Sequence, residues 1–279
     1  MEILVIGAGV IGVTTAYMLS KAGYQVTVIE ANSTVASEAS HANGGQLSYD
    51  FATPMGSPAL LRKLPAILAG KDIGFRMAPG FDRHYLGWSA QFLKNCAPAR
   101  TKENAAKLSS LVTASGKALQ TIIAETEIEF KYRKAGKLVV YETETALAAT
   151  RKAAEGDTND QLKILSADEC RALEPALDHR HAPMAGGVWA ADDDVGDAAL
   201  FTQNLATYCR KKLNARFILG EIVENFLIEN NTVRGVLTNS GQTIDADKIT
   251  CCLGAHGDTL LRPLGIRLPI YPIKGYSIT

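Results

Sequence analysis

The chain has 279 residues, 47% of them hydrophobic, and its 29 basic and 29 acidic side chains leave a formal net charge of zero. This balance lacks the basic surplus of a nucleic-acid-binding protein, so we expect no nucleic-acid partner, and the length suffices for one large domain or two modest ones. Five cysteines without a C-x-x-C pattern favour a reducing compartment, and the sequence predicts neither a signal peptide nor a membrane-spanning helix.

Residues 2–31 organise the chain. Residues 3–6 are a short run of β-formers, typical of a buried parallel strand. The pattern G-x-G-x-x-G follows directly, formed by Gly7, Gly9 and Gly12. Apolar residues then recur at helical spacing, and residues 25–29 predict a second strand that ends at Glu30.

This arrangement predicts a dinucleotide site. Gly7 would permit the tight turn, Gly9 the approach of a pyrophosphate to the backbone, and Gly12 the close packing of helix and strand. The helix N-terminus offers free N–H donors to phosphate, and Glu30 can accept hydrogen bonds from a ribose. The alternative is a glycine-rich turn in an α/β domain that binds no nucleotide.

A second candidate segment is the 43–46 loop, which reads Asn43-Gly44-Gly45-Gln46. Small residues allow backbone to lie against a flat ligand, and Asn and Gln supply both donors and acceptors. A plain surface loop is the competing interpretation.

The remaining segments alternate between helices and strands. We expect helices over residues 60–68, 81–96, 101–126, 143–154, 166–174, 197–213 and 258–264. We expect strands over residues 129–133, 136–141, 162–165, 186–190, 215–219, 221–229, 232–239, 242–245, 248–253 and 270–279. The helix that starts at Ser166 is predicted from its capping-box pattern.

No metal site is predicted. The pair His179 and His181 lacks further spaced ligands, and the acidic run 192–194 lacks the glycine and distal Glu of a calcium loop. We therefore expect the acidic run to be a solvated turn. Cys251 and Cys252 are expected to pack within the protein.

The later segments resemble the FAD-dependent D-amino acid dehydrogenase small subunit, within the wider family of D-amino acid, glycine and sarcosine oxidases. The similarity runs along the whole chain and rests on these segments: Ser40-x-x-Asn43-x-Gly45-Gln46, Glu174-Pro175, Gly196-Asp197, Phe201-Thr202-Gln203-Asn204-Leu205-Ala206, Gly254 and Tyr271-Pro272-x-Lys274-Gly275-Tyr276.

The resemblance implies an α/β protein with a Rossmann-like FAD-binding domain, formed by residues 1–54 and 196–279, and an inserted α+β substrate domain, residues 55–195. It implies that FAD contacts Ile6, Gly7, Ala8, Gly9, Val10, Ile11, Gly12, Glu30, Ala31, Ser37, Ser40, Asn43, Gly44, Gly45, Gln46, Val223, Gly254 and Ala255. Val223 would meet the adenine through its backbone.

The activity implied is oxidative deamination of D-amino acids to 2-oxo acids and ammonia, with electrons passed to an acceptor such as a quinone. A cytoplasmic protein, peripheral on the inner membrane, would fit this activity. No side chain need act as a base, so no catalytic residue is named. Relatives that oxidise glycine, sarcosine or proline, an NAD-dependent dehydrogenase and a non-catalytic FAD-binding fragment are the alternatives.

Family members continue beyond the segment that matches residues 271–276. The groups that bind the substrate carboxylate would lie in that continuation, so the sequence is expected to be a fragment with an incomplete substrate domain. The strand expected at 270–279 would then be partly exposed, and an apolar unpaired strand favours self-association.

Overall fold

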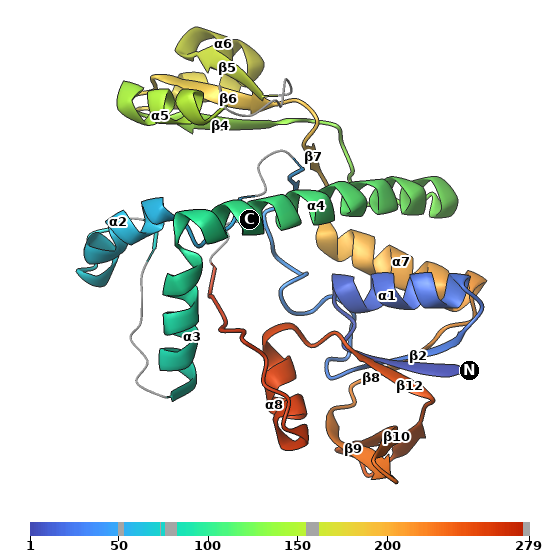
Figure 1. Ribbon diagram of the computed structural model, residues 1–279. Helices are drawn as coiled ribbons and strands as arrows, with labels where there is room; N and C mark the ends of the chain where they lie inside the picture. Colours follow the sequence, from blue (N-terminus) through green and yellow to red (C-terminus); the bar gives the residue numbers. More distant parts are fainter. Residues whose placement is uncertain (50–52, 73, 76–82, 155–161, 276–279) are drawn as a thin grey trace.

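The computed structural model describes residues 1–49, 53–72, 74–75, 83–154 and 162–275 (Figure 1). Its main sheet has four parallel strands in the order β12-β1-β2-β8. These strands are β1 (Glu2–Ile6), β2 (Gln25–Glu30), β8 (Arg216–Leu219) and β12 (Lys248–Cys251). The sheet confirms the α/β class, because adjacent parallel strands need the helical crossovers that the sequence indicates.

Two layers cover this sheet. Helices α1 (Val10–Lys21) and α7 (Ala198–Lys212) lie on one face, and a three-stranded antiparallel sheet lies on the other (Figure 1). Alternation along β1 explains both layers, because Val5 packs in the helical core while Leu4 and Ile6 pack against the second sheet. The second sheet consists of β9 (Val223–Glu229), β10 (Thr232–Thr238) and β11 (Thr243–Asp245).

A third sheet lies away from the parallel one, with antiparallel strands in the order β4-β6-β5. These strands are β4 (Lys137–Tyr141), β5 (Leu162–Ser166) and β6 (Gly186–Ala190), accompanied by α5 (Glu144–Ala154) and α6 (Ala167–Leu173). The predicted capping box is confirmed, because Ser166 and Glu169 exchange both bonds at the start of α6. The short helix η1 (Pro175–His179) follows.

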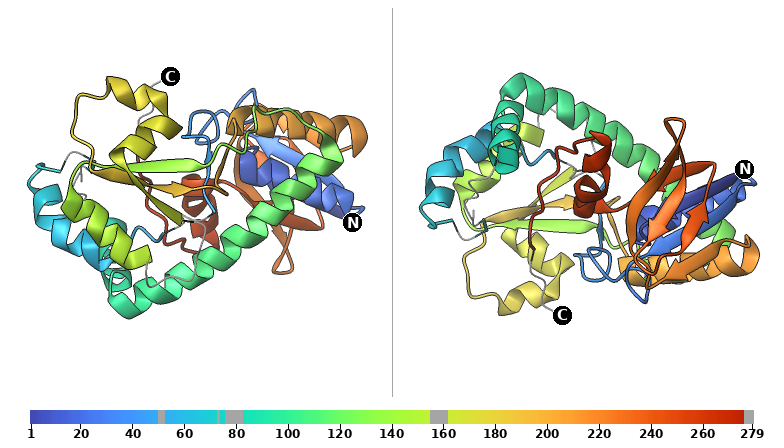
Figure 2. Two further views of the ribbon diagram at one scale, coloured as in Figure 1. Left: turned by 90° about the horizontal axis from the view of Figure 1, so that it is seen from above. Right: turned by 90° about the horizontal axis from the view of Figure 1, so that it is seen from below.

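The long helix α4 (Pro98–Thr126) joins the two ends of the molecule. Figure 2 shows it running from α2 (Pro58–Leu68) and α3 (Arg83–Asn95) at one end to α1 and α7 at the other. At that second end, Ile122 of α4 belongs to the same core as α1 and α7. The division into residues 1–54 with 196–279 and 55–195 stays a prediction, and this core draws residues from both parts.

Two short strands pair between the sheets, β3 (Gln46–Leu47) and β7 (Asp194–Val195). After β12 the chain forms η2 (Gly254–His256), α8 (Gly257–Leu261) and η3 (Arg262–Leu264). Among the described residues, no helix combines the length and apolar composition that crossing a membrane needs.

Two expected strands are wrong. In residues 129–133, Lys131 takes a left-handed φ of 55° and Phe130 turns into the helical core, so that only Arg133 forms a bridge, to Val195. Residues 270–275 form no strand. Pro272 has no N–H to donate to a neighbouring strand, and the Tyr271 ring packs against α3. Residues 276–279 of that expected strand lie outside the described part.

The core around α7 gives a direct test of this packing. Leu205 of α7 is fully buried, whereas Leu111 of α4 is 67% exposed. We expect Leu205→Ala to lower the free energy of unfolding by about 2–5 kcal/mol through lost burial and a residual cavity. Leu111→Ala, a matched helical leucine, should change it by about 0.5 kcal/mol or less. Urea unfolding followed by circular dichroism measures both, and equal losses would contradict this core.

Candidate functional site

Where β1 leads into α1, the structure leaves no space for a side chain at Gly7 or at Gly12. Gly7 has a φ of 101°, and a Cβ there would lie 2.6 Å from the carbonyl oxygen of Cys252. A Cβ on Gly12 would lie 1.8 Å from the carbonyl oxygen of Gly7. The amide of Gly7 donates to the carbonyl of Ile29, which ties the turn to β2 as well (2.8 Å). The turn is therefore packed by β2 and β12 on its inner side.

The outer side of this turn is accessible. Gly9 is the N-cap of α1 and has no side chain to cap the helix, so the amides of Ile11 and Gly12 in its first turn are available to an acceptor. Among the described residues, a Cβ on Gly9 would meet the Ser40 hydroxyl alone, at 3.4 Å. Ile11 is 65% exposed, whereas Ile6 and Ala8 are buried. This geometry suits an anion at the helix N-terminus.

Glu30 lies beside this turn at the carboxyl end of β2. One carboxylate oxygen accepts the amide of Ala8 (2.7 Å), and the other accepts the backbone and side-chain nitrogens of Asn32 (2.9 Å each). The carboxylate is therefore fixed next to the turn, where a ribose that follows a bound phosphate would lie. The neighbouring Ala31 is exposed.

The chain after β2 folds back onto the same turn. The hydroxyl of Ser40, a buried residue, accepts the amide of Val10 (3.0 Å), and the amide of Ala36 donates to the carbonyl of Ala8 (3.0 Å). Ser37 is engaged within its own loop, because its hydroxyl donates to the Thr34 carbonyl. Ser40 thus contacts the glycine turn. The Ser37 hydroxyl bonds within its own loop and not to this turn.

The 43–46 loop is shaped by its own side chain and by β7. The Asn43 side-chain oxygen accepts the amide of Gly45 (2.9 Å), and Gly45 has a left-handed φ of 61°. The carbonyl of Gly45 accepts the amide of Gly196 (2.8 Å), and a Cβ on Gly45 would lie 2.9 Å from the Gly196 carbonyl oxygen. Gln46 and Gly44 are exposed. The loop therefore presents a structured and accessible surface.

The last predicted residues lie on two other elements. Gly254 and Ala255 are exposed in η2, directly after β12 at the carboxyl end of the parallel sheet. A Cβ on Gly254 would find no atom of the described residues within 4 Å outside its chain neighbours. Val223, the first residue of β9, is half-buried against the core shared by the two sheets. Hydrogen bonds between described residues join neither this group nor the 43–46 loop directly to the glycine turn.

The acidic run 192–194 differs from the expected solvated turn. Asp192 is exposed, but Asp193 and Asp194 are only 1% and 6% exposed. The Asp194 carboxylate accepts the Tyr132 hydroxyl (2.7 Å), and the Asp193 carboxylate accepts the amide of Tyr49 (2.7 Å). The pattern of three aspartates gave no sign of this burial, because the partners are distant in sequence. In the described part of the chain, no group of three His, Cys, Asp or Glu could hold a metal ion.

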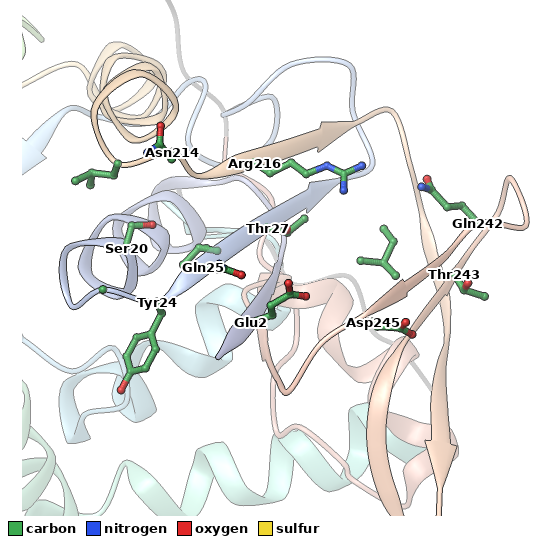
Figure 3. A pocket seen from close by; sticks show the side chains of 14 residues that line it. Glu2, Ser20, Tyr24, Gln25, Thr27, Asn214, Arg216, Gln242, Thr243 and Asp245 are labelled. Atoms are coloured by element: carbon green, nitrogen blue, oxygen red, sulfur yellow. The ribbon is translucent and has the colours of Figure 1, made fainter.

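A pocket of about 750 Å³ lies at the opposite end of the parallel strands (Figure 3). Glu2, Gln25 and Thr27 line it from β1 and β2, together with Arg216 of β8 and Asp245 of β11. Ligands of open α/β sheets bind beyond the carboxyl ends of the strands. This pocket contains none of the predicted cofactor residues, so we do not assign the cofactor to it.

Two glycines of the turn are expected to respond differently to one added methyl group. Gly12→Ala forces the backbone of Gly7 to move and should cost about 1–3 kcal/mol of unfolding free energy. Gly9→Ala should change stability by about 0.5 kcal/mol or less but weaken FAD binding about tenfold or more by obstructing the pyrophosphate. Thermal unfolding and FAD titration of both variants measure this. Unchanged FAD affinity in Gly9→Ala would contradict the assignment.

The chain is similar to known proteins over its whole length. A D-amino acid dehydrogenase of Rhizobium johnstonii is 36% identical, over 100% of this chain and 67% of that protein. The glycine oxidase structure from Bacillus cereus superposes with a TM-score of 0.62 at 20% identity, covering 94% of this chain and 58% of that chain. The L-proline dehydrogenase structure from P. horikoshii gives 0.63 at 20% identity, covering 95% and 56%.

These comparisons have two consequences. The structural likenesses show the fold, and the chain spans only about three fifths of the solved structures and two thirds of the dehydrogenase. The sequence also matches the family described as DAO, FAD dependent oxidoreductase, over residues 2–279. With a glycine turn, a fixed acid and a parallel sheet that all fit a dinucleotide, the chain belongs to this family of FAD-dependent oxidoreductases.

Proposed function

We propose that this chain forms the FAD-binding part of a D-amino acid dehydrogenase, which converts D-amino acids to 2-oxo acids and ammonia. The observation that carries this proposal is the alignment of the entire chain, at 36% identity, with a relative of that name. The accessible glycine turn at the carboxyl end of β1 supports it, because Gly9 leaves the N-terminus of α1 without a side-chain cap, where a pyrophosphate would bind.

The adenosine half of FAD would lie beside α1. The amides of Ile11 and Gly12 in the first turn of α1 would donate to the pyrophosphate, and the helix dipole favours that negative charge. Glu30 would accept the ribose hydroxyls, and its bonds to Ala8 and Asn32 hold the carboxylate ready for them. The backbone of Val223 would meet the adenine.

The flavin half would lie along the 43–46 loop. The exposed Gly44 leaves room for a flat ring beside the half-buried Gly45, while Gln46 and the Asn43 side chain supply polar groups. Ser37 and Ser40 would face the ribityl chain, and Gly254 and Ala255 would approach the cofactor from β12. Each of these assignments is part of the proposal.

Bound FAD would supply the two-electron acceptor for a hydride from the substrate α-carbon. The protein would hold the amino acid with a neutral amine and exclude the opposite hand, and water would then hydrolyse the resulting imine. No described side chain is assigned as a base, because release of a hydride from a neutral amine requires none.

The electron acceptor and location extend the proposal. We propose a quinone as the final acceptor and a peripheral position on the cytoplasmic face of a membrane. All five cysteines are free, which fits a reducing compartment. Glycine-, sarcosine- or proline-oxidising activity is the second candidate, since glycine oxidase and L-proline dehydrogenase share the fold.

Substrate choice tests the proposal. The chain is purified alone and joined to the continuation that the family has beyond the segment matching residues 271–276, and each protein is saturated with FAD and supplied with an artificial acceptor dye and one amino acid at a time. In the extended protein we expect faster dye reduction with D-alanine than with L-alanine, glycine, sarcosine or L-proline, because the proposed site selects the D hand. The chain alone should bind FAD and reduce no dye, because the groups for the substrate carboxylate are expected in the continuation. Reduction with glycine, sarcosine or L-proline but not D-alanine would favour the second candidate. FAD binding by the extended protein without reduction by any of them would contradict the proposed dehydrogenase activity.

A further inference from the structure

The buried carboxylates of Asp193 and Asp194 lie next to β3, the strand that begins at the last residue of the 43–46 loop. Strand β7, which contains Asp194, pairs antiparallel with β3, so that Leu47 lies opposite Asp194 and Gln46 opposite Val195. Asp193 precedes β7 and is 1% exposed. Burying a carboxylate costs free energy unless hydrogen bonds offset that cost. The hydrogen-bond donors of these two carboxylates therefore indicate which segments they hold in place.

Asp193 holds the backbone at the far end of β3. Its carboxylate accepts the amide of Tyr49 at 2.7 Å. The Tyr49 ring packs against α4, where a Cβ on Gly116 would lie 3.0 Å from it. Burial, followed by the charge of Asp194, raises the pKa of the Tyr49 hydroxyl, so it stays protonated. Tyr49 is thus fixed by its backbone and by its ring.

The neighbouring groups connect the same segment to the rest of the protein. The Tyr132 hydroxyl donates to Asp194 and accepts the Gln120 side chain of α4 (2.8 Å). The Lys137 ammonium at the start of β4 donates to the Ser48 hydroxyl (3.0 Å). Residues 46–49, which begin at the last residue of the 43–46 loop, are therefore held by contacts with β7, α4 and β4.

We propose that Asp193 is a positioning residue for the flavin half of FAD. By holding the Tyr49 backbone it fixes β3, and β3 fixes the end of the 43–46 loop. This inference rests on the proposed function, because it takes that loop to contact the flavin. Asp193 touches no reacting atom and acts only through the loop.

The adenosine half of the site is held by separate contacts. The glycine turn is tied to Glu30, Ser40 and Ile29, and none of these bonds involves β3 or β7. Loss of the Asp193 carboxylate should therefore affect flavin binding and leave adenosine and pyrophosphate binding intact. ADP, which lacks the flavin, is the probe that separates the two halves.

The experiment titrates the flavin-free chain with FAD and with ADP. Asp193→Ala is expected to raise the Kd for FAD about tenfold and to leave the Kd for ADP within about twofold. Asp193→Asn keeps the shape and an accepting oxygen, so its Kd for FAD should lie between those of the wild type and Asp193→Ala. If Asp193→Ala does not fold, Asp193→Asn carries the test. Flavin absorbance of the complexes should shift in the same order.

The matched control is Asp192→Ala, which removes the exposed neighbouring carboxylate and should leave both Kd values unchanged. An equal loss of FAD and ADP affinity in the Asp193 variants would assign Asp193 to the fold alone and overturn the inference. Unchanged FAD affinity would overturn it as well. A wild-type chain that binds neither ligand would instead overturn the proposed function, so the two failures are distinguishable.

Discussion

The close approach of three backbone segments at Gly7 is the constraint on which the site depends. The carbonyl of Gly7 lies where a Cβ on Gly12 would be, and the carbonyl of Cys252 lies where a Cβ on Gly7 would be. Only glycine at both positions lets α1 start directly at the end of β1 while β12 ends beside it. This contact sets the start of α1 at the carboxyl end of β1. Burial raises the pKa of the Cys252 thiol, which keeps it an uncharged packing group.

The rest of the fold supports that contact from both faces. Alternating residues of β1 belong to two different cores, one with α1 and α7 and one with β9 to β11. Strand β2 then delivers Glu30 to the edge where α1 begins, and β12 delivers Gly254 to the same edge. The carboxyl ends of parallel strands necessarily meet, so residues far apart in sequence surround one place. The 43–46 loop reaches its position by a different route, through its pairing with β7.

Much of this could be predicted from sequence because local signals agree there with the final structure. The β1–α1–β2 unit, the capping box at Ser166 and the hairpin of β9 and β10 each follow from neighbouring residues. The errors arise where distant contacts decide. Phe130 packs in the helical core instead of a strand, and Asp193 is buried and accepts the amide of Tyr49. A run of acidic residues predicts solvent exposure unless the distant partner is known.

The central claim is that the accessible N-terminus of α1, with Glu30 beside it, is an FAD site of this chain. Isothermal titration of the flavin-free chain with FAD and with NAD tests this most directly, because both ligands share the adenosine and pyrophosphate that the glycine turn can hold. The account predicts saturable binding of FAD at one site per chain and much weaker binding of NAD, which lacks a flavin for the 43–46 loop. Binding of NAD without binding of FAD would contradict it.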